Sequence, residues 1–334
     1  MTAPPADREG LVELAAIRAA AERLRGIAIR TPLVAFGPPH DRTFLKAESL
    51  QPIGAFKIRG AYVAVASLTD AERARGVITY SSGNHGQGVA RAARLLGAPC
   101  VVVMPSDAPA LKRARVSADG AQVVIVGPSS EERRQVAERI AAERSLSVIP
   151  PYDDERIIAG QGTVGLEIVE DLPDVATILV PVGGGGLASG VASAAKAMRP
   201  SIRVIGVEPE LAADAQASLA RGEIVRWPAE AVGRTIADGT RTQSLGALTF
   251  RHLRAHLDGI VTVTEAEIVA AVRLAAERSR LVVEPSGALS IAAMTYRRPD
   301  LGSDGAGPTV AIVSGGNVDP AAYLSYLTEP APDR

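Results

Sequence analysis

Lys57 is the side chain whose type and surroundings most directly indicate covalent chemistry. It lies between apolar neighbours in the segment 52–62, at the start of a predicted helix. Burial and the positive end of the helix dipole disfavour an ammonium, so the pKa of such a lysine falls and its amine becomes a nucleophile near neutral pH. The chain holds four lysines against 32 arginines, so lysine is not its general surface cation. A surface lysine with a buried stem is the alternative, and the residues alone leave both open.

A run of four glycines, Gly183–Gly186, indicates an anion site. It follows an apolar predicted strand and opens a predicted helix, where backbone N–H groups and the helix dipole attract phosphate. The run lacks Gly-Lys-Ser/Thr, which argues against a nucleotide P-loop. Gly183, Gly185 and Ala188 also fit the dinucleotide pattern G-x-G-x-x-G/A, with Glu208 in the place of a ribose-binding acid. A dinucleotide, a simple phosphate and tight helix packing are three open interpretations of this loop.

Two polar turns each follow a predicted strand. One is the segment 81–88, which contains two serines, Asn84 and His85, and the other is Ser-Gly-Gly-Asn at 314–317. Hydroxyl, amide and free backbone N–H groups at a helix start suit a carboxylate, and open α/β sheets bind ligands at the carboxyl ends of their strands. We therefore expect the two turns and the glycine run to meet in one crevice. The alternative for Ser82 or Asn84 is a plain helix N-cap.

The elements that must position these residues alternate between strands and helices. Apolar β-branched runs predict buried parallel strands, and alanine-rich stretches with 3.6-residue periodicity predict the helices that cover them, so the expected class is α/β. The predicted strands are Val77–Tyr80, Cys100–Met104, Val123–Val126, Ile178–Val182, Val204–Glu208 and Val310–Ser314. The predicted helices include Gln87–Leu96, Ser130–Glu143, Gly186–Met198 and Ala266–Ser279.

Composition and charge limit the class of partner. Of the 334 residues, 47% are hydrophobic and 22% charged, which excludes disordered and disulfide-scaffold classes. A formal net charge of −1 provides no field for nucleic acid or an anionic membrane, so we expect neither partner and predict a small-molecule ligand instead. Cys100, the only cysteine, lies in an apolar run and is expected to be an unreactive buried thiol. The first residues show no basic segment followed by an apolar one, so we expect no signal peptide and a cytoplasmic location.

Seven motifs, taken together and in order, resemble the threonine dehydratase and serine racemase family of pyridoxal-phosphate (PLP) enzymes. The resemblance runs from about Ile27 to Leu324. It implies the tryptophan-synthase-β-like fold, fold type II, with two open parallel-sheet lobes, and it makes the dinucleotide interpretation remote. The motifs are GAFKIRGA at 54–61, SSGNHGQ at 81–87, GGGG at 183–186, GVEP at 206–209, IADG at 236–239, VEPSGA at 283–288 and SGGN at 314–317.

The resemblance implies which residues hold the cofactor. Lys57 would bind it covalently, with Phe56 beside the ring and Asn84 at the 3′-hydroxyl. Ser314 would meet the pyridine nitrogen, and a neutral hydroxyl there need not protonate the ring, which favours elimination over a fully delocalised carbanion. The other implied cofactor-binding residues are Gly183, Gly184, Gly185 and Gly186 at the phosphate, together with Gly239 and Glu284.

The implied reaction is elimination of water from L-threonine or L-serine, giving ammonia and a 2-oxo acid. Lys57, released from the cofactor by the substrate amine, would take the Cα proton. The opposite face of the substrate would meet Ser82, which could instead deliver a proton there, so serine racemase activity is one alternative. threo-3-Hydroxyaspartate is another, because a nearby arginine could meet its extra carboxylate. The implied residues at the substrate carboxylate are Ser81, Ser82, Asn84 and His85.

The resemblance also implies a divalent-cation site and a two-domain architecture. Mg²⁺ or Ca²⁺ would bind the carboxylates of Glu208 and Asp214 and the carbonyl of Ala212; the alternative is that Glu208 merely ends a strand and Asp214 is solvated. A large PLP-binding domain, residues 1–64 and 150–334, would face a small mobile domain, residues 65–149, that closes on the substrate. A homodimer or homotetramer is expected. A PLP carrier without turnover is the remaining non-enzymatic alternative.

Overall fold

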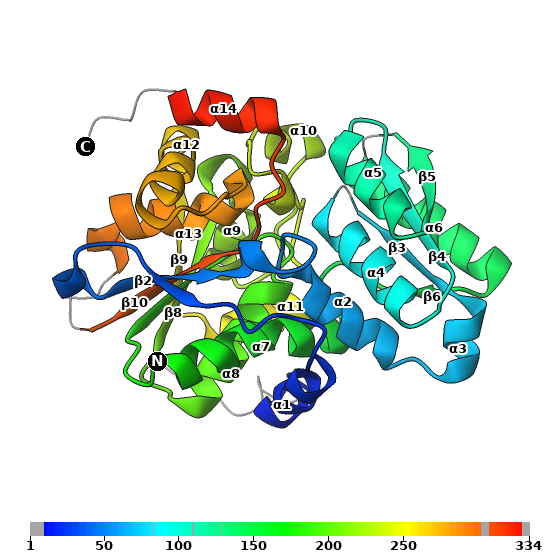
Figure 1. Cartoon of the computed structure of the whole chain (residues 1–334), viewed down its shortest axis with the longest axis horizontal. Coiled ribbons are helices and arrows are strands. Elements are labelled where there is room, and N and C mark those ends of the chain that lie inside the picture. Colours follow the sequence, from blue (N-terminus) through cyan, green and yellow to red (C-terminus); the bar gives the residue numbers. More distant parts are fainter. Residues whose placement is uncertain (1–9, 82, 109, 128, 302–306, 329–334) are drawn as a thin grey trace.

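Two sheets organise the chain, and they lie side by side (Figure 1). The computed structural model describes residues 10–328 except 82, 109, 128 and 302–306. The six-stranded sheet has the order β1-β2-β10-β7-β8-β9, in which only the β1–β2 pair is antiparallel. Its strands are β1 (Leu33–Ala35), β2 (Thr43–Ala47), β7 (Thr177–Pro181), β8 (Arg203–Pro209), β9 (Gly259–Val263) and β10 (Thr309–Val313).

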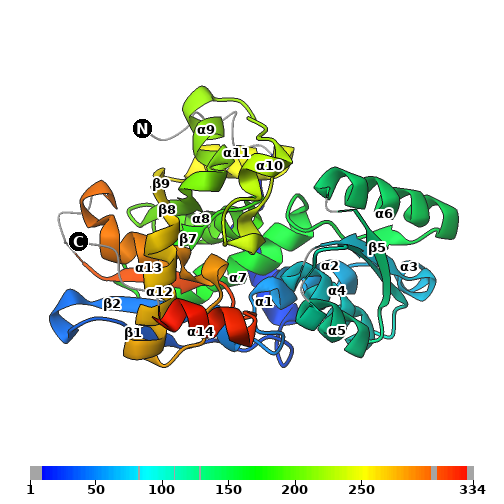
Figure 2. The ribbon, with the colours of Figure 1, turned by 90° about the horizontal axis from the view of Figure 1, so that it is seen from above.

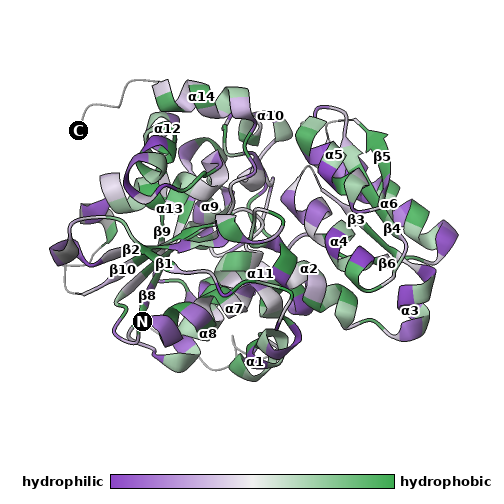
Figure 3. Ribbon diagram, viewed as in Figure 1, coloured by the Kyte–Doolittle hydropathy of each residue, from purple (hydrophilic) through white to green (hydrophobic). Residues whose placement is uncertain are grey.

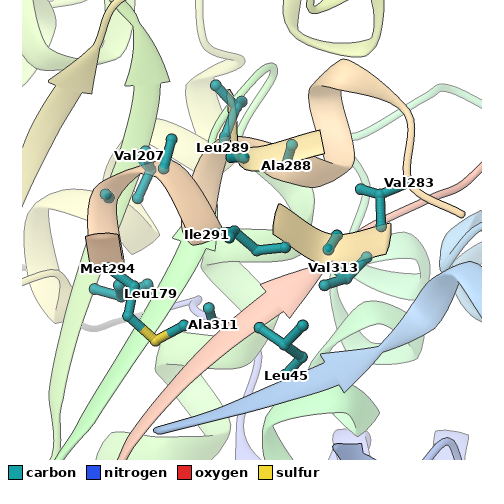
Figure 4. Close-up of a cluster of buried hydrophobic side chains, with 14 of the residues drawn as sticks. Leu45, Leu179, Val207, Val283, Ala288, Leu289, Ile291, Met294, Ala311 and Val313 are labelled. Carbon is teal, nitrogen blue, oxygen red and sulfur yellow. The ribbon is translucent and has the colours of Figure 1, made fainter. Parts of the chain in front are cut away.

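Helices cover both faces of the larger sheet (Figure 2). Leu179 and Ala311 face a core built with α12 (Glu265–Leu274) and α13 (Pro285–Tyr296), part of which Figure 4 shows. Their neighbours Ile178 and Val310 face the opposite core, built with α7 (Glu155–Asp171) and α8 (Gly186–Met198). Because successive strand residues point to opposite faces, a sheet covered on both sides needs continuous apolar strands, as this sequence has.

The smaller sheet repeats this plan. Its strands are all parallel in the order β5-β4-β3-β6, and Figure 3 colours β3, β4 and β5 as mostly hydrophobic. Val102 and Met104 pack towards α2, α4 and α5, whereas Val101 and Val103 pack towards α6. The elements are β3 (Val77–Tyr80), β4 (Cys100–Pro105), β5 (Gln122–Val126), β6 (Ser147–Val148), α2 (Lys57–Ala66), α4 (Asn84–Leu95), α5 (Ala110–Ala118) and α6 (Ser130–Arg144).

Several further helices and short turns complete the fold. None of the helices in the described part of the chain is long and apolar enough to cross a membrane. These helices are α1 (Leu14–Arg23), α3 (Asp70–Arg75), α9 (Asp214–Arg221), α10 (Ala229–Val232), α11 (Ala247–His256), the π-helical turn Ala275–Ser279 and α14 (Pro320–Thr328), with short 3₁₀ turns at Glu48–Leu50, Glu210–Ala212 and Asp238–Thr240.

The α/β class and all six predicted strands are confirmed, with boundaries that differ by at most one residue. The helix predicted at 266–279 is α12 continued by the π-helical turn. Cys100 is buried in β4, and burial raises the pKa of its thiol to about 12, as expected for an unreactive core cysteine. The sequence analysis did not predict β1, β2, β6 or β9. The domain boundaries at 65–149 and the mobility of that domain stay predictions.

Helices α2, α7 and α8 approach one another unusually closely at glycines. A Cβ on Gly160 of α7 would lie 2.6 Å from Cα of Gly60 in α2. A Cβ on Gly190 of α8 would lie 2.3 Å from the carbonyl oxygen of Ile158 and 2.4 Å from the backbone nitrogen of Gly162. Such distances leave no room for a side chain, so glycine sets the spacing of three helices. Two of them, α2 and α8, begin at the predicted lysine and glycine run.

Gly190→Ala tests this contact. The added methyl meets rigid backbone rather than a flexible side chain, so we expect a loss of about 1–3 kcal/mol in the free energy of unfolding, measured by chemical denaturation. The matched control is Gly259→Ala, where a Cβ would meet nothing within 4 Å, and where a change below about 0.5 kcal/mol is expected. Equal stabilities of the two variants would show that α7 and α8 can move apart at little cost.

Candidate active site

A cavity of ≈ 250 Å³ lies where the loops after β3, β7 and β10 meet. These loops are the two polar turns and the glycine run, so the expected single crevice is present. The predicted site residues that line it are Phe56, Lys57, Ser81, Asn84, His85, Gly183, Gly184, Gly185, Gly186, Gly239, Glu284 and Ser314. Ser82 lies outside the described residues, and the three predicted metal-binding residues lie elsewhere.

Lys57 is the first residue of α2 and reaches the cavity from one side. Its Nζ donates to the carbonyl of Pro151 at 2.8 Å and lies 5.2 Å from the centre of the Phe56 ring. The surrounding protein desolvates the amine and lowers its pKa to about 8. A substantial fraction of this side chain is therefore a neutral amine at slightly alkaline pH, as a nucleophile or a base requires.

The glycine run forms an anion cradle on another wall. Gly185 has φ +91°, a left-handed conformation that glycine adopts without strain, and it caps α8, which starts at Gly186. A Cβ on Gly184 would lie 2.1 Å from the Tyr152 ring, so no side chain fits there. A Cβ on Gly183 would lie 3.1 Å from the carbonyl of Gly239. The loop and the first turn of α8 thus present backbone N–H groups that suit a phosphate.

Asn84 is held by partners from the larger sheet's lobe. Its Nδ2 donates to Oε1 of Glu284 at 2.5 Å, and its Oδ1 accepts from Nδ2 of Asn317 at 2.8 Å. Burial raises the pKa of Glu284 to about 7. Ser314 donates from Oγ to the carbonyl of Ser286 at 3.3 Å, and its own carbonyl accepts from the backbone of Phe56.

His85 is buried and neutral at the same turn. Burial and the charge of Lys57 lower the pKa of His85 to about 3. Its Nε2 donates to the carbonyl of Ile149 at 3.1 Å, and Nδ1 has no partner within the described chain. The ring therefore offers a lone pair, which repels a carboxylate. A contribution of His85 to a carboxylate site would come from its backbone N–H in the first turn of α4.

The cavity wall also contains charged residues to which the sequence analysis assigned no role. Its charged lining consists of six cationic and three acidic side chains, a surplus that favours an anionic ligand. Arg134 is bound by Glu131 and Glu138, and Arg241 donates to the carbonyl of Thr235. Among these residues only Lys112 had a signal in the sequence that could have suggested a role, namely the scarcity of lysine in this chain. The charged lining is Lys57, Lys112, Glu131, Arg133, Arg134, Arg226, Asp238, Arg241 and Glu284.

The two acidic residues of the predicted cation site form a buried carboxylate pair, with Glu208 near the end of β8 and Asp214 at the start of α9. Glu208 is fully buried and accepts from the backbone nitrogens of Ala215 and Gln216 at 3.0 and 2.8 Å. Asp214 is equally buried, and neither of its carboxylate oxygens has a partner in the described part of the chain. Desolvation raises the pKa of both groups, that of Asp214 to about 7. The alternative of a solvated Asp214 is therefore wrong.

Comparison with known proteins identifies the class of this site. The family model described as pyridoxal-phosphate dependent enzyme matches residues 24–315. This chain therefore belongs to the family of PLP-dependent enzymes, and its fold is the expected tryptophan-synthase-β-like fold, fold type II.

Individual relatives carry different activities. The chain is 41% identical over 314 residues to L-threo-3-hydroxyaspartate ammonia-lyase of Saccharomyces cerevisiae, covering 92% of this chain and 94% of that one. Maize serine racemase superposes with a TM-score of 0.88 at 39% identity, covering 94% and 96% of the two chains. The threonine deaminase of T.th. superposes with a TM-score of 0.85 at 43% identity, covering 92% and 99%.

The dinucleotide interpretation of the glycine run finds no support. The acid that would bind a ribose, Glu208, is fully buried, and both of its oxygens accept from backbone nitrogens of α9. The cavity instead joins the glycine run to an amine, as PLP requires. Its donor set fits a cofactor with a phosphate at one end and an aldehyde at the other.

The pKa of Lys57 predicts how cofactor uptake depends on pH. If Lys57 is the residue that binds PLP, its neutral amine would attack the aldehyde, and the fraction of neutral amine grows as pH rises through about 8. We expect the rate of covalent attachment of PLP to the apoenzyme, followed by absorbance between pH 6.5 and 9.5, to level off above this value. The control is Nα-acetyl-lysine in solution, whose ordinary pKa of about 10.4 keeps its rate rising throughout. The same steep rise for both amines would contradict a lowered pKa.

Proposed function

We propose that this chain eliminates water from a β-hydroxy amino acid, L-threonine or L-serine, to give ammonia and a 2-oxo acid. The observation that carries the proposal is that one cavity joins the amine of Lys57, the glycine cradle and the polar turn at Ser81 and Asn84. PLP, when bound, withdraws electrons from the substrate's Cα and so makes its proton acidic. Ammonia-lyases of this family among the relatives support the reaction class.

Each wall of the cavity has a separate task in this proposal. The N–H groups of Gly183–Gly186 bind the phosphate, and Phe56 flanks the ring. Asn84, oriented by Glu284, donates to the 3′-oxygen. The hydroxyl of Ser314 meets the pyridine nitrogen without protonating it, which disfavours full delocalisation of charge into the ring and so favours loss of the β-hydroxyl.

Proton transfer at Cα is assigned to Lys57. Once the substrate amine has released it, its neutral amine lies in a desolvated site with a carbonyl as its hydrogen-bond partner, so it can accept the Cα proton. The substrate carboxylate would be bound by Ser81, Ser82 and the backbone N–H groups at the start of α4. Closure of the domain 65–149 over the substrate would exclude water from this step.

Lys57→Ala tests the central assignment. We expect loss of covalently bound PLP and a decrease of more than about 10³-fold in 2-oxo acid and ammonia formation from L-threonine or L-serine. Lys196→Ala is the matched control, because Lys196 binds Asp258 at the far end of α8 and should leave both measurements unchanged. Full ammonia release by Lys57→Ala would refute the proposal.

L-threo-3-Hydroxyaspartate is the second candidate substrate. The cationic surplus of the cavity, with Arg133, Arg134, Arg226 and Arg241 in its wall, could bind a second carboxylate. The yeast relative that acts on this compound supports it. Comparing kcat/KM for hydroxyaspartate, threonine and serine distinguishes the candidates, since a bound second carboxylate would make hydroxyaspartate the best substrate by tenfold or more.

Serine racemase activity is a further alternative, supported by the similarity to maize serine racemase. It would require a proton donor facing Cα from the side opposite Lys57, a role for which Ser82 is the candidate. Its test is the same assay followed by chiral analysis of the remaining serine.

A homodimer or homotetramer and a cytoplasmic location stay predictions.

A divalent cation, Mg²⁺ or Ca²⁺, is proposed at Glu208, Asp214 and the carbonyl of Ala212. The orphaned oxygens of Asp214 and the raised pKa of both acids fit a site that a cation would neutralise. No group of three or more histidine, cysteine or acidic side chains gathers here or anywhere else among the residues that the structure describes. Backbone carbonyls and water would have to complete the shell around the two carboxylates.

Chelation should lower the melting temperature more at pH 8 than at pH 6. The folded pKa of Asp214 is raised to about 7, so without a cation the pair is stable while protonated and loses that stability as pH rises through 7. We expect a difference of at least about 3 °C with and without chelator at pH 8. The variant Glu208→Gln/Asp214→Asn should lose this sensitivity. A chelator that changes neither protein's melting temperature would contradict a cation site.

A further inference from the structure

Lys112 has no task in the proposed function, although it lies inside the active-site cleft. It is one of four lysines in a chain that uses arginine 32 times, and its residue exposure is 5%. It starts from the first turn of α5 in the small-sheet lobe and passes the polar turn, where a Cβ on Gly83 would lie 2.7 Å from its Cδ. Its ammonium then reaches two carboxylates of the other lobe.

The two carboxylates are Asp238 and Glu284. Nζ of Lys112 donates to Oδ2 of Asp238 and lies 3.7 Å from Oε2 of Glu284. Although burial disfavours the ammonium, these two charges raise the pKa of Lys112 above its ordinary value. The three side chains lie between the ≈ 250 Å³ cavity and a second cavity of ≈ 560 Å³ between the lobes, and they are among the six residues that line both.

Glu284 is the partner that connects Lys112 to the cofactor site. Its Oε1 accepts from Nδ2 of Asn84, whereas Oε2 has no hydrogen bond within the described chain. The charged groups that face it are Lys112 from α5 and Asp238 from the 3₁₀ turn after β8 and α10. The backbone of Gly315 closes the remaining side, because a Cβ there would lie 2.1 Å from Oε1.

The ionisation of Glu284 decides how Asn84 can be oriented. An ionised carboxylate only accepts hydrogen bonds, so Asn84 must turn its amide nitrogen towards it and its oxygen towards Asn317, as observed. A protonated Glu284 could instead donate to the Asn84 oxygen, and this would compete with the hydrogen bond from Asn317, whose amide is itself held by Arg115 and the carbonyl of Ile53. The pKa of Glu284, about 7 even with Lys112 present, places it close to this change at neutral pH.

We propose that Lys112 is a positioning residue: by bridging Asp238 and Glu284 across the cleft, it favours the ionised form of Glu284 and thereby helps to hold the amide of Asn84 towards the cofactor. The inference rests on the proposed function only in placing Asn84 at the 3′-oxygen. A compact ammonium with rotatable donors suits a narrow site between two carboxylates, whereas a planar guanidinium needs a wider one. This explains why a lysine stands here in a chain rich in arginine.

The test is a pH titration of the visible spectrum and of the PLP dissociation constant in the holoenzyme without substrate. In Lys112→Met the pKa of Glu284 should rise by at least about one unit from its value of about 7, so near pH 7 we expect PLP binding weaker by about fivefold or more and an altered spectrum. Both should return towards the parent values by pH 9, where Glu284 ionises. Adding Glu284→Gln to Lys112→Met should abolish this pH dependence.

Two further variants separate positioning from mere structure. Asp238→Asn removes the other carboxylate but leaves Lys112 beside Glu284. Because the charge of Asp238 raises the pKa of Glu284, this titration should move to lower pH, opposite to that of Lys112→Met. Lys112→Arg keeps the charge and should restore the parental pH profile at least in part. Lys112→Gln, which is also neutral, replaces Lys112→Met if that variant fails to fold. A defect in Lys112→Met that is equal at all pH values, or no defect, would overturn the proposal. Because the readouts need no turnover, an enzyme that binds PLP but does not eliminate water would refute the proposed function alone.

Discussion

Four charged side chains, three of them buried and one partly exposed, hold together the segments that carry Lys57. Arg59 donates to both oxygens of Glu48 at 2.8 Å and to Glu167 at 2.6 Å, and Lys46 donates to Glu167 at 2.6 Å. Burial alone would raise the pKa of Glu48, but the charge of Arg59 brings it below its ordinary value. Two cations and two carboxylates give this network no net charge. Because each charge has an opposite partner, the attraction between them offsets the cost of removing the four groups from water. Losing any one of them would leave an uncompensated charge.

The network joins elements that are far apart in the sequence but meet at the site. Lys46 lies in β2, Arg59 in the first turn of α2 and Glu167 in α7. The start of α2 therefore cannot turn without breaking ion pairs. The glycine contacts then fix α7 against α2 and α8, and α8 begins at the phosphate cradle. Lys57 and the cradle are thereby held on one rigid unit. If PLP binds as proposed, to Lys57 at one end and to the glycine run at the other, it needs this fixed spacing, because a small displacement of either end would misplace the reacting atoms.

The local sequence pattern predicted those elements whose residues all lie in the same kind of environment, such as strands that are buried along their whole length. Strands such as 100–105 are buried on both faces, so their apolar runs identify them from sequence alone. β2 was missed because its buried sequence Thr-Phe-Leu-Lys-Ala contains Lys46, which is tolerated only through Glu167, 121 residues away. The loops that line the cavity were predictable because glycine runs and polar turns follow strands. Lys112 and Asp238, 126 residues apart, were assigned no role, since no local signal shows which carboxylate a lysine will meet.

The lysines show why partner sets, rather than residue types, decide the chemistry. Lys57 and Lys112 both lie in the wall of the same cavity, and both are taken out of bulk water. Lys57 donates to a carbonyl, so desolvation dominates and lowers its pKa to about 8. Lys112 meets two carboxylates, which outweigh its burial and raise its pKa. One cavity thus holds an amine that can lose its proton and an ammonium that cannot. Exchanging their partners would exchange their roles, although the sequence at both positions would still read lysine.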